Sequence, residues 1–301
     1  MKKLFWAVFL LLGYAFNAHS EEAKAPFEGE LQLTTFINLC DYINNSGMMA
    51  GGNGIHYQTL VLKGDKGKLI DKTTGATTVW DLSKGEYVTF IDELKKGLSY
   101  ENNLDAILML APRDTKIYGK YLQKLLSNTI AVTGTAQNID GHDCVEMKGT
   151  IVREQGGMES KFGIKVFCDS AIAVPSGYAA AIYGLEVPGL PMKWTYQYDG
   201  GHVPVAGELS VYMETTVTDI QPRSVDDSEF ARPTTQKPRR GETPDPNVLS
   251  GYKMTKTTSP MSMMGYFKAA NKFAKEKIAA DKASGNQDGY DSFQTSGEWD
   301  F

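Results

Sequence analysis

The sequence predicts a mainly β protein built around a single antiparallel sheet. Residues 27–230 form a succession of short runs in which apolar and polar side chains alternate, and Gly, Asp, Asn or Lys residues separate the runs. The chain also contains 30 Gly, 15 Tyr and 13 Phe, a composition that favours turns and strands. Because the connections are short, we expect neighbouring strands to pair antiparallel.

The individual strands follow from this alternation. We expect strands at 31–37, 56–63, 67–71, 77–82, 86–92, 192–198 and 208–220, and a hairpin from Cys144 to Cys168 that turns at Gly156-Gly157. The glycine-rich stretch 44–54 lies between the first two strands and lacks the spacing of a phosphate-binding loop. It is expected to be a flexible hairpin tip.

A helical pattern interrupts the strands after Pro112. Asp114 is a suitable N-cap for a helix over residues 115–126. Its apolar stripe would contain Ile117, Tyr118, Tyr121, Leu122, Leu125 and Leu126. Since an apolar sheet face must be buried, this helix is the expected cover of the sheet.

The first twenty residues have the organisation of an export signal. Lys2 and Lys3 precede an apolar run over 4–16, and small side chains occupy the cleavage positions of Ala18-His19-Ser20. We expect cleavage after Ser20 and a periplasmic or secreted protein. The run is short for ~30 Å of hydrocarbon, so an uncleaved membrane anchor is the second interpretation. No cysteine lies near the cleavage point, which argues against a lipid anchor.

Three further segments are expected beyond the β-domain of residues 27–232. Residues 233–258 are rich in proline and predict an extended linker. Residues 259–282 predict an amphipathic helix, which would dock on the β-domain, enter a partner's groove or lie on an anionic membrane surface. Residues 283–301 predict a disordered acidic tail.

Charge and cysteine content narrow the possible partners. The formal net charge is -5, and removing the two lysines of the export signal leaves about -7, which disfavours a nucleic-acid partner. In an oxidising compartment the three cysteines allow one disulfide. Cys144 and Cys168 are the expected pair because they flank the predicted hairpin. Strand alternation places Cys168 inward and Cys144 outward, however, so the bond would need a β-bulge.

No catalytic or metal-binding motif stands out. His56, His142 and His202 are scattered without metal-ligand spacing, and the chain lacks a C-x-x-C pair, a nucleophile elbow and an H-E-x-x-H helix. We therefore expect no enzyme activity, no catalytic residue, no metal and no cofactor. A hydrolase assembled from residues distant in the sequence is the remaining enzymatic alternative.

The strongest functional pattern is apolar. If the covering helix leaves the sheet face partly open, large side chains on that face would line a site for an apolar ligand; otherwise they form the core. The candidate ligand-binding residues are Leu62, Trp80, Phe90, Leu122, Trp194, Tyr196 and Met213.

Several short segments, taken in order, resemble the periplasmic lipoprotein-carrier superfamily of LolA and LolB type, and especially its small exported relatives. After the export signal, these segments are 27–29, 62–66, 141–144 and 217–233. The resemblance implies an unclosed antiparallel β-barrel wrapped over helices, with an interior that holds acyl chains in the carriers. It carries over no catalytic residue.

We therefore expect an exported, non-enzymatic binding protein that shelters a lipid or acyl chain in the concave face of its sheet. The alternative is an envelope structural or interaction protein with a dry core, which would engage a protein partner through residues 259–301.

Overall fold

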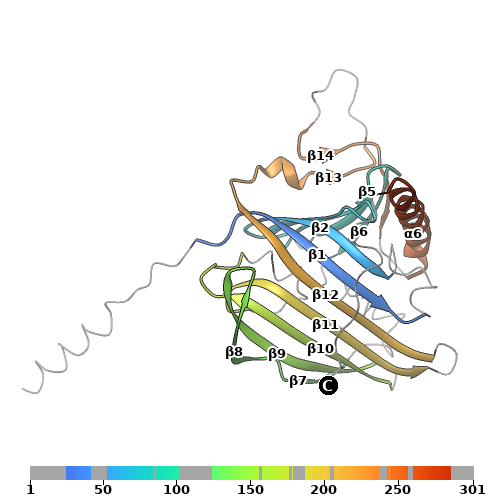
Figure 1. The fold of residues 1–301 in the computed structure, drawn as a ribbon. Coiled ribbons are helices and arrows are strands. Elements are labelled where there is room, and N and C mark those ends of the chain that lie inside the picture. Colours follow the sequence, from blue (N-terminus) through green and yellow to red (C-terminus); the bar gives the residue numbers. More distant parts are fainter. Residues whose placement is uncertain are drawn as a thin grey trace, which may run out of the picture.

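The computed structural model describes residues 25–41, 53–84, 86–101, 124–155, 158–175, 178, 187–203, 207–236, 243, 245–256 and 260–285. These residues form one large curved sheet that does not close on itself, with a long helix at one end (Figure 1). The predicted mainly β fold with a single curved antiparallel sheet is therefore confirmed.

Among the described residues, the sheet has thirteen strands. Their order in space is β15 (Lys253–Lys256), β6 (Lys96–Glu101), β5 (Glu86–Ile91), β4 (Ala76–Asp81), β3 (Lys66–Asp71), β2 (Gly54–Lys63), β1 (Gly29–Leu39), β12 (Gly207–Pro222), β11 (Leu190–Val203), β10 (Met158–Asp169), β9 (His142–Gln155) and β7 (Lys124–Asn128), with β8 (Ala131–Ile139) also paired to β9. All pairs are antiparallel except β15 with β6.

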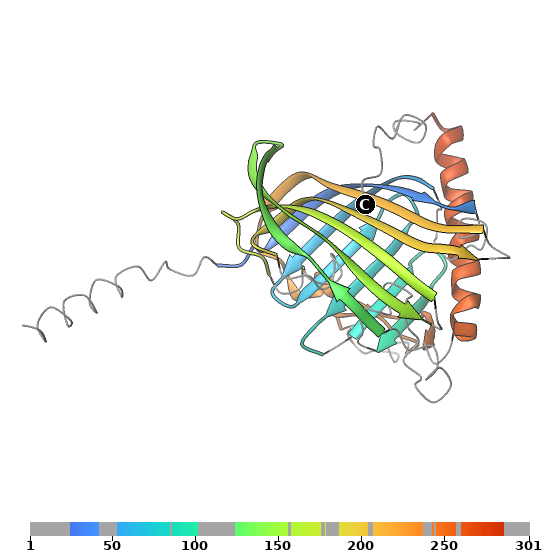
Figure 2. The ribbon, with the colours of Figure 1, turned by 90° about the horizontal axis from the view of Figure 1, so that it is seen from below.

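Alternation along each strand separates an inner face from an outer face. In β1, Leu31 and Leu33 are almost completely buried, while the side chains between and beside them are half-exposed. The curl of the sheet brings β2–β6 and β9–β10 to opposite sides of one interior, as Figure 2 shows from below. The inner face can therefore bury itself against its own opposite wall.

The helix α6 (Pro260–Ala283) covers one end of this inner face. Tyr266 and Ala270 are buried and cluster with Ile91 of β5 and Leu98 of β6. Strand register places Ile91 and Leu98 on the inner face. The expected docking of an amphipathic helix on the β-domain is confirmed.

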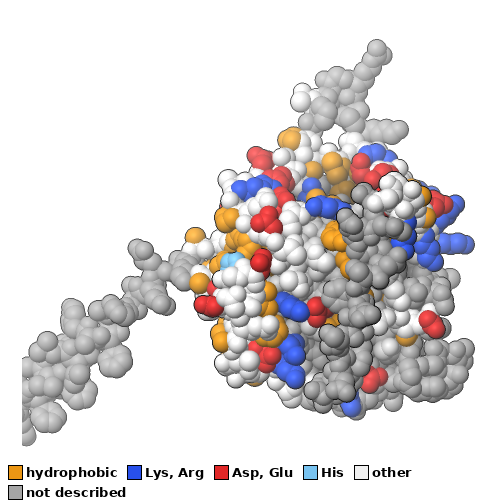
Figure 3. Space-filling model, viewed as in Figure 1, with side chains coloured by type: hydrophobic (Ala, Val, Ile, Leu, Met, Phe, Trp, Pro, Cys, Tyr) orange, Lys and Arg blue, Asp and Glu red, His pale blue; other side chains and the backbone are white. Residues whose placement is uncertain are grey.

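The outward side of α6 is basic. Lys268, Lys272 and Lys275 are exposed on it, and Figure 3 shows Lys and Arg side chains gathered where α6 lies. Lys272 pairs with Glu276 at 3.7 Å along the helix. Such exposed pairs contribute little to stability, so α6 is held mainly by its apolar side.

The predicted helix over residues 115–126 is wrong at its C-terminal end. Residues 124–126 belong to β7, which pairs with β9 and places Leu125 opposite Arg153. A short apolar run fits a strand as well as a helix, and the edge of β9 offers backbone hydrogen bonds to a strand. The rest of the predicted helix lies outside the described residues, and the cover that the structure does describe is α6.

The predicted linker over 233–258 is also wrong in part, because its second half packs on the outer face. β13 (Arg232–Pro233) pairs with β14 (Val248–Leu249), and β15 extends the sheet edge. Tyr252 is buried against Phe90, with ring centroids 5.6 Å apart in an edge-to-face arrangement. A few apolar side chains thus attach a segment whose overall composition is that of a linker.

Ion pairs fasten this outer layer to the sheet. The short 3-10 helix η2 (Asp227–Phe230) begins with Asp227, which lies 3.1 Å from Lys63 and 3.2 Å from Lys66. Arg232 lies 3.5 Å from the buried carboxylate of Asp81. Against the effect of burial, the hydrogen bond from Ser83 and the nearby charges of Lys84 and Arg232 lower the Asp81 pKa. The outer layer covers β2–β5 and is part of the domain.

The predicted export signal and acidic tail lie outside the described residues, apart from 283–285 at the end of α6. Within the described part of the chain, no helix has the length and apolar character needed to cross a bilayer.

We predict that Gly67→Ala destabilises the protein by about 1–3 kcal/mol, because a Cβ atom there would lie 2.1 Å from the ring of the buried Trp80. Gly265→Ala, on the exposed side of α6 where no atom lies within 4 Å, should stabilise by up to about 1 kcal/mol. Urea unfolding of both variants measures this. Equal effects would contradict the packing of Trp80 over Gly67.

Candidate functional site: the inner face of the sheet

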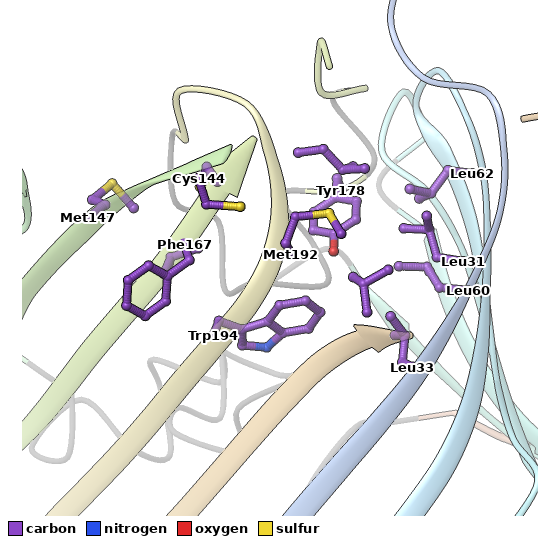
Figure 4. Close-up of a cluster of buried hydrophobic side chains, with 14 of the residues drawn as sticks. Leu31, Leu33, Leu60, Leu62, Cys144, Met147, Phe167, Tyr178, Met192 and Trp194 are labelled. Carbon is purple, nitrogen blue, oxygen red and sulfur yellow. The ribbon is translucent and has the colours of Figure 1, made fainter. Parts of the chain in front are cut away.

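Most of one continuous apolar cluster, here called the inner cluster, lies on the inner face. Residues from both walls contribute, and each is at most 8% exposed. The members are Phe27, Leu31, Leu33, Leu60, Leu62, Trp80, Tyr87, Ile139, Cys144, Met147, Phe162, Ile164, Val166, Phe167, Cys168, Tyr178, Leu190, Met192, Trp194, Tyr196 and Val217. Figure 4 shows leucines of β1 and β2 facing Met192 and Trp194 across the interior.

Most of the predicted ligand-binding residues lie on this face. Leu62, Trp80, Trp194 and Tyr196 belong to the inner cluster, and Met213 packs against it while partly buried. The structure therefore brings together side chains from β2, β4, β11 and β12. Whether they contact a ligand remains a prediction.

The assignment of Phe90 to this face is wrong. In β5, Tyr87 pairs with Trp80 and faces inward, so Phe90, three residues later, faces outward. There it belongs to a second apolar cluster, here called the outer cluster, whose other buried members are Val61, Val79, Val88, Val225, Phe230 and Tyr252. Leu122 lies outside the described residues.

Tyr178 fills part of the space between the two walls. It is fully buried, and its ring meets Trp194 edge-to-face with centroids 6.1 Å apart. Its hydroxyl donates to the carbonyl oxygen of Pro191 at 3.1 Å. Figure 4 shows Tyr178 between Met192 and the leucines of β1–β2. Its role could not be inferred from the sequence, because Tyr178 lies in a proline-punctuated stretch without periodicity.

A buried polar network adjoins the inner cluster on β1, β2 and β12. Thr35 donates its hydroxyl proton to Gln58 Oε1 at 2.8 Å, so at the 2.9 Å contact between the two threonine hydroxyls Thr215 must be the donor. Thr35 and Thr215 are 2% and 3% exposed. Because each hydroxyl has a partner, the network places polarity inside the sheet without a large desolvation cost.

Next to this network lies a buried His–Asp pair. His56 Nδ1 lies 2.9 Å from Asp71 Oδ2, and the His56 side chain is 3% exposed. The other Asp71 oxygen accepts the backbone N–H groups of Thr73 and Thr74 at 2.9 and 3.0 Å. Asp71 thus closes the turn between β3 and β4 and orients the imidazole.

The His–Asp arrangement resembles two members of a hydrolase triad, but its surroundings favour a structural role. Thr35 is the register partner of His56 on β1, and its proton goes to Gln58. A nucleophile would have to direct that proton to the imidazole. Spacing in the sequence could not reveal this pair, because His56 and Asp71 come together through the register of β2 and β3.

The expected disulfide between Cys144 and Cys168 is not present, and all three cysteines are free. Cys168 stands opposite Val145 on β9, and Cys144 stands opposite Asp169, so alternation directs the two side chains to opposite faces. The bulge that would realign them lies instead between β10 and β11. Burial raises the pKa of Cys144 to about 11 and that of Cys168 to about 12.

Within the part of the chain that the structure describes, no group of three or more His, Cys, Asp or Glu side chains is placed to hold a metal ion. No protein-family model matches this chain, and no curated protein matches it.

We predict that iodoacetamide at pH 8 labels Cys40 well before Cys144 and Cys168. The two buried thiols stay protonated at that pH because burial raises each pKa far above 8, whereas Cys40 is only half-buried. Peptide mass spectrometry of native and urea-unfolded protein measures this. A Cys144–Cys168 disulfide in the native protein would contradict the register described above.

Proposed function

We propose that this chain is an exported, non-enzymatic binding protein that shelters an apolar ligand, a lipid or acyl chain, on the concave face of its sheet. One observation carries the proposal: an unclosed sheet directs the large apolar side chains of both walls, including Trp80 and Trp194, into one shared interior. Ligand sites of this kind are concave and mostly apolar, with few polar groups.

The energetics favour a chain-like apolar guest. Transferring about ten methylene groups from water to such an interior contributes roughly 8 kcal/mol at ~0.8 kcal/mol each, before the costs of association. No ionic contact is needed for that affinity. The apolar inner cluster supplies the required surface, and the threonine network supplies a polar boundary.

Partly buried side chains indicate where a ligand would enter. Ile151, Tyr198 and Met213 pack against the inner cluster without being fully buried. Strand register aligns Tyr198 with Phe162 on β10 and, in the next row, Tyr196 with Met213 on β12. Partly exposed apolar side chains in neighbouring rows are what we expect around a ligand entrance, so we place the entrance at this end of β10–β12.

Two sequence features agree with the proposal. The pattern of residues 1–20 favours export, which would place the protein in the periplasm or outside the cell. The resemblance to LolA-type carriers implies an interior for acyl chains.

The alternative function is that of an interaction protein that binds an envelope partner through residues 259–301. The exposed lysines on α6 favour it, since they offer a basic surface. The apolar side of α6 is already engaged with β5 and β6, which leaves only its polar side for a partner.

We predict that Met213→Glu weakens binding of the neutral fluorophore N-phenyl-1-naphthylamine by about tenfold or more, because it places a carboxylate among the apolar inner side chains. Thr216→Glu is the matched control, since Thr216 is also half-buried on β12 but faces outward beside Lys193. It should change the dissociation constant by less than about twofold. Absence of saturable fluorophore binding to the wild-type protein would overturn the proposal.

Removing residues 286–301 separates the two functions. The truncation leaves every described element intact, so fluorophore affinity should equal that of the full chain. Under the alternative, affinity capture from envelope extracts would recover less partner with the truncated protein, because only the α6 part of residues 259–301 would remain. A truncated protein that folds normally by circular dichroism but no longer binds the fluorophore would contradict a site on the inner face.

A further inference from the structure

One buried polar group on the inner face has no partner. Tyr87 of β5 is 1% exposed and belongs to the inner cluster. Its register partners are Trp80 on β4 and Tyr100 on β6. Its hydroxyl makes no hydrogen bond to any residue that the structure describes. Buried hydroxyl groups are nearly always paired, so an unpaired one on a candidate ligand-binding face requires an explanation.

The other fully buried tyrosine of the inner cluster shows the ordinary arrangement. The Tyr178 hydroxyl donates to the Pro191 carbonyl oxygen, so this side chain is satisfied within the protein. Tyr87 has the same burial and the same kind of apolar surroundings, but lacks such an acceptor. The two residues therefore differ in whether a partner must come from elsewhere.

The surroundings of Tyr87 limit the chemistry of that partner. Burial is the single cause of its raised pKa, and no neighbouring charge contributes. The phenol thus stays protonated and acts as a hydrogen-bond donor near neutral pH. An ionised carboxylate or phosphate buried there would have no counter-charge among the described residues, which carries a large desolvation cost. A neutral acceptor carries no such cost.

The position of Tyr87 along the sheet also fits an anchor for a chain. On the inner face it lies in the same row as Trp80, Gly67 and Leu62, whereas α6 covers the rows of Leu98 and Ile91. The rest of the inner cluster extends from this row to Leu60, Leu31 and the opposite wall. A head group at Tyr87 would thus leave its chain against continuous apolar surface.

We propose that the Tyr87 hydroxyl donates a hydrogen bond to the carbonyl oxygen of a neutral acyl ester or amide whose hydrocarbon chain lies along the inner cluster. The inference rests on the proposed function and narrows its ligand class. Neutral acyl esters and amides are selected over ionised fatty acids, which present a carboxylate at the same place.

The test compares methyl decanoate, decane and sodium decanoate as competitors of N-phenyl-1-naphthylamine. Wild-type protein should bind methyl decanoate more tightly than decanoate. Tyr87→Phe should weaken methyl decanoate binding by about fivefold, the loss of one neutral hydrogen bond, and leave decane binding unchanged. Tyr178→Phe is the matched control, because its hydroxyl already has a protein acceptor, and it should not alter the ratio of ester to decane affinity.

Two further measurements make the result specific. The infrared carbonyl band of bound methyl decanoate should lie at lower frequency in wild type than in Tyr87→Phe, because a hydrogen bond weakens the C=O bond. Thermal unfolding without ligand should show that Tyr87→Phe is at least as stable as wild type, because it removes an unpaired buried hydroxyl.

The outcomes separate the two proposals. An unchanged carbonyl band, or equal ester affinity in wild type and Tyr87→Phe while decane still binds, overturns the role of Tyr87 and leaves the proposed function in place. Failure of every competitor and of the fluorophore to bind wild-type protein overturns both.

Discussion

The strict two-residue alternation of side chains along each strand is the constraint on which this structure depends. It makes one face of a long sheet apolar, and a single layer cannot bury that face unless the sheet curls or another element covers it. Here both occur. β1 and β2 face β11 across the interior, and α6 covers the rows that contain Ile91 and Leu98. The outer face of β2–β5 is also apolar and is covered by residues 223–236 and 245–254.

The two faces differ in how they are stabilised. The outer layer is held by a small cluster around Tyr252 together with the ion pairs of Asp227 and Arg232. The inner face combines a large apolar cluster, a paired threonine network and the unpaired hydroxyl of Tyr87. Within the described part of the chain, the inner face joins extensive apolar side chains to an unused hydrogen-bond donor, which is why we place the function there.

Strand positions were predictable because period-two alternation is a local property of the sequence. The predicted strand at 31–37 became β1, and the predicted hairpin between Cys144 and Cys168 became β9 and β10. To predict which face of the sheet a side chain occupies, the pairing register of the strands was needed as well. Trp80 and Phe90 seem equivalent in the sequence, but the pairing of Asp81 with Glu86 across the turn places them on opposite faces.

Contacts between distant strands could not be predicted in this way. Thr35 and Thr215 are 180 residues apart, and the sequence around either residue does not predict their hydrogen bond. Likewise, whether the Tyr87 hydroxyl finds a hydrogen-bond acceptor depends on the positions of all the side chains around it. The linker was misassigned because Leu249 and Tyr252 are sparse within a polar, proline-rich stretch, and sparse anchors leave no periodic pattern.

The most direct measurement is an experimental structure, at a resolution that shows ordered waters, of protein purified from its native envelope without detergent exchange. The proposed function predicts elongated density along the inner cluster, ending within hydrogen-bond distance of the Tyr87 hydroxyl. An interior in which side chains meet from wall to wall, with Tyr87 bonded to water or to the protein and no additional density, would contradict it.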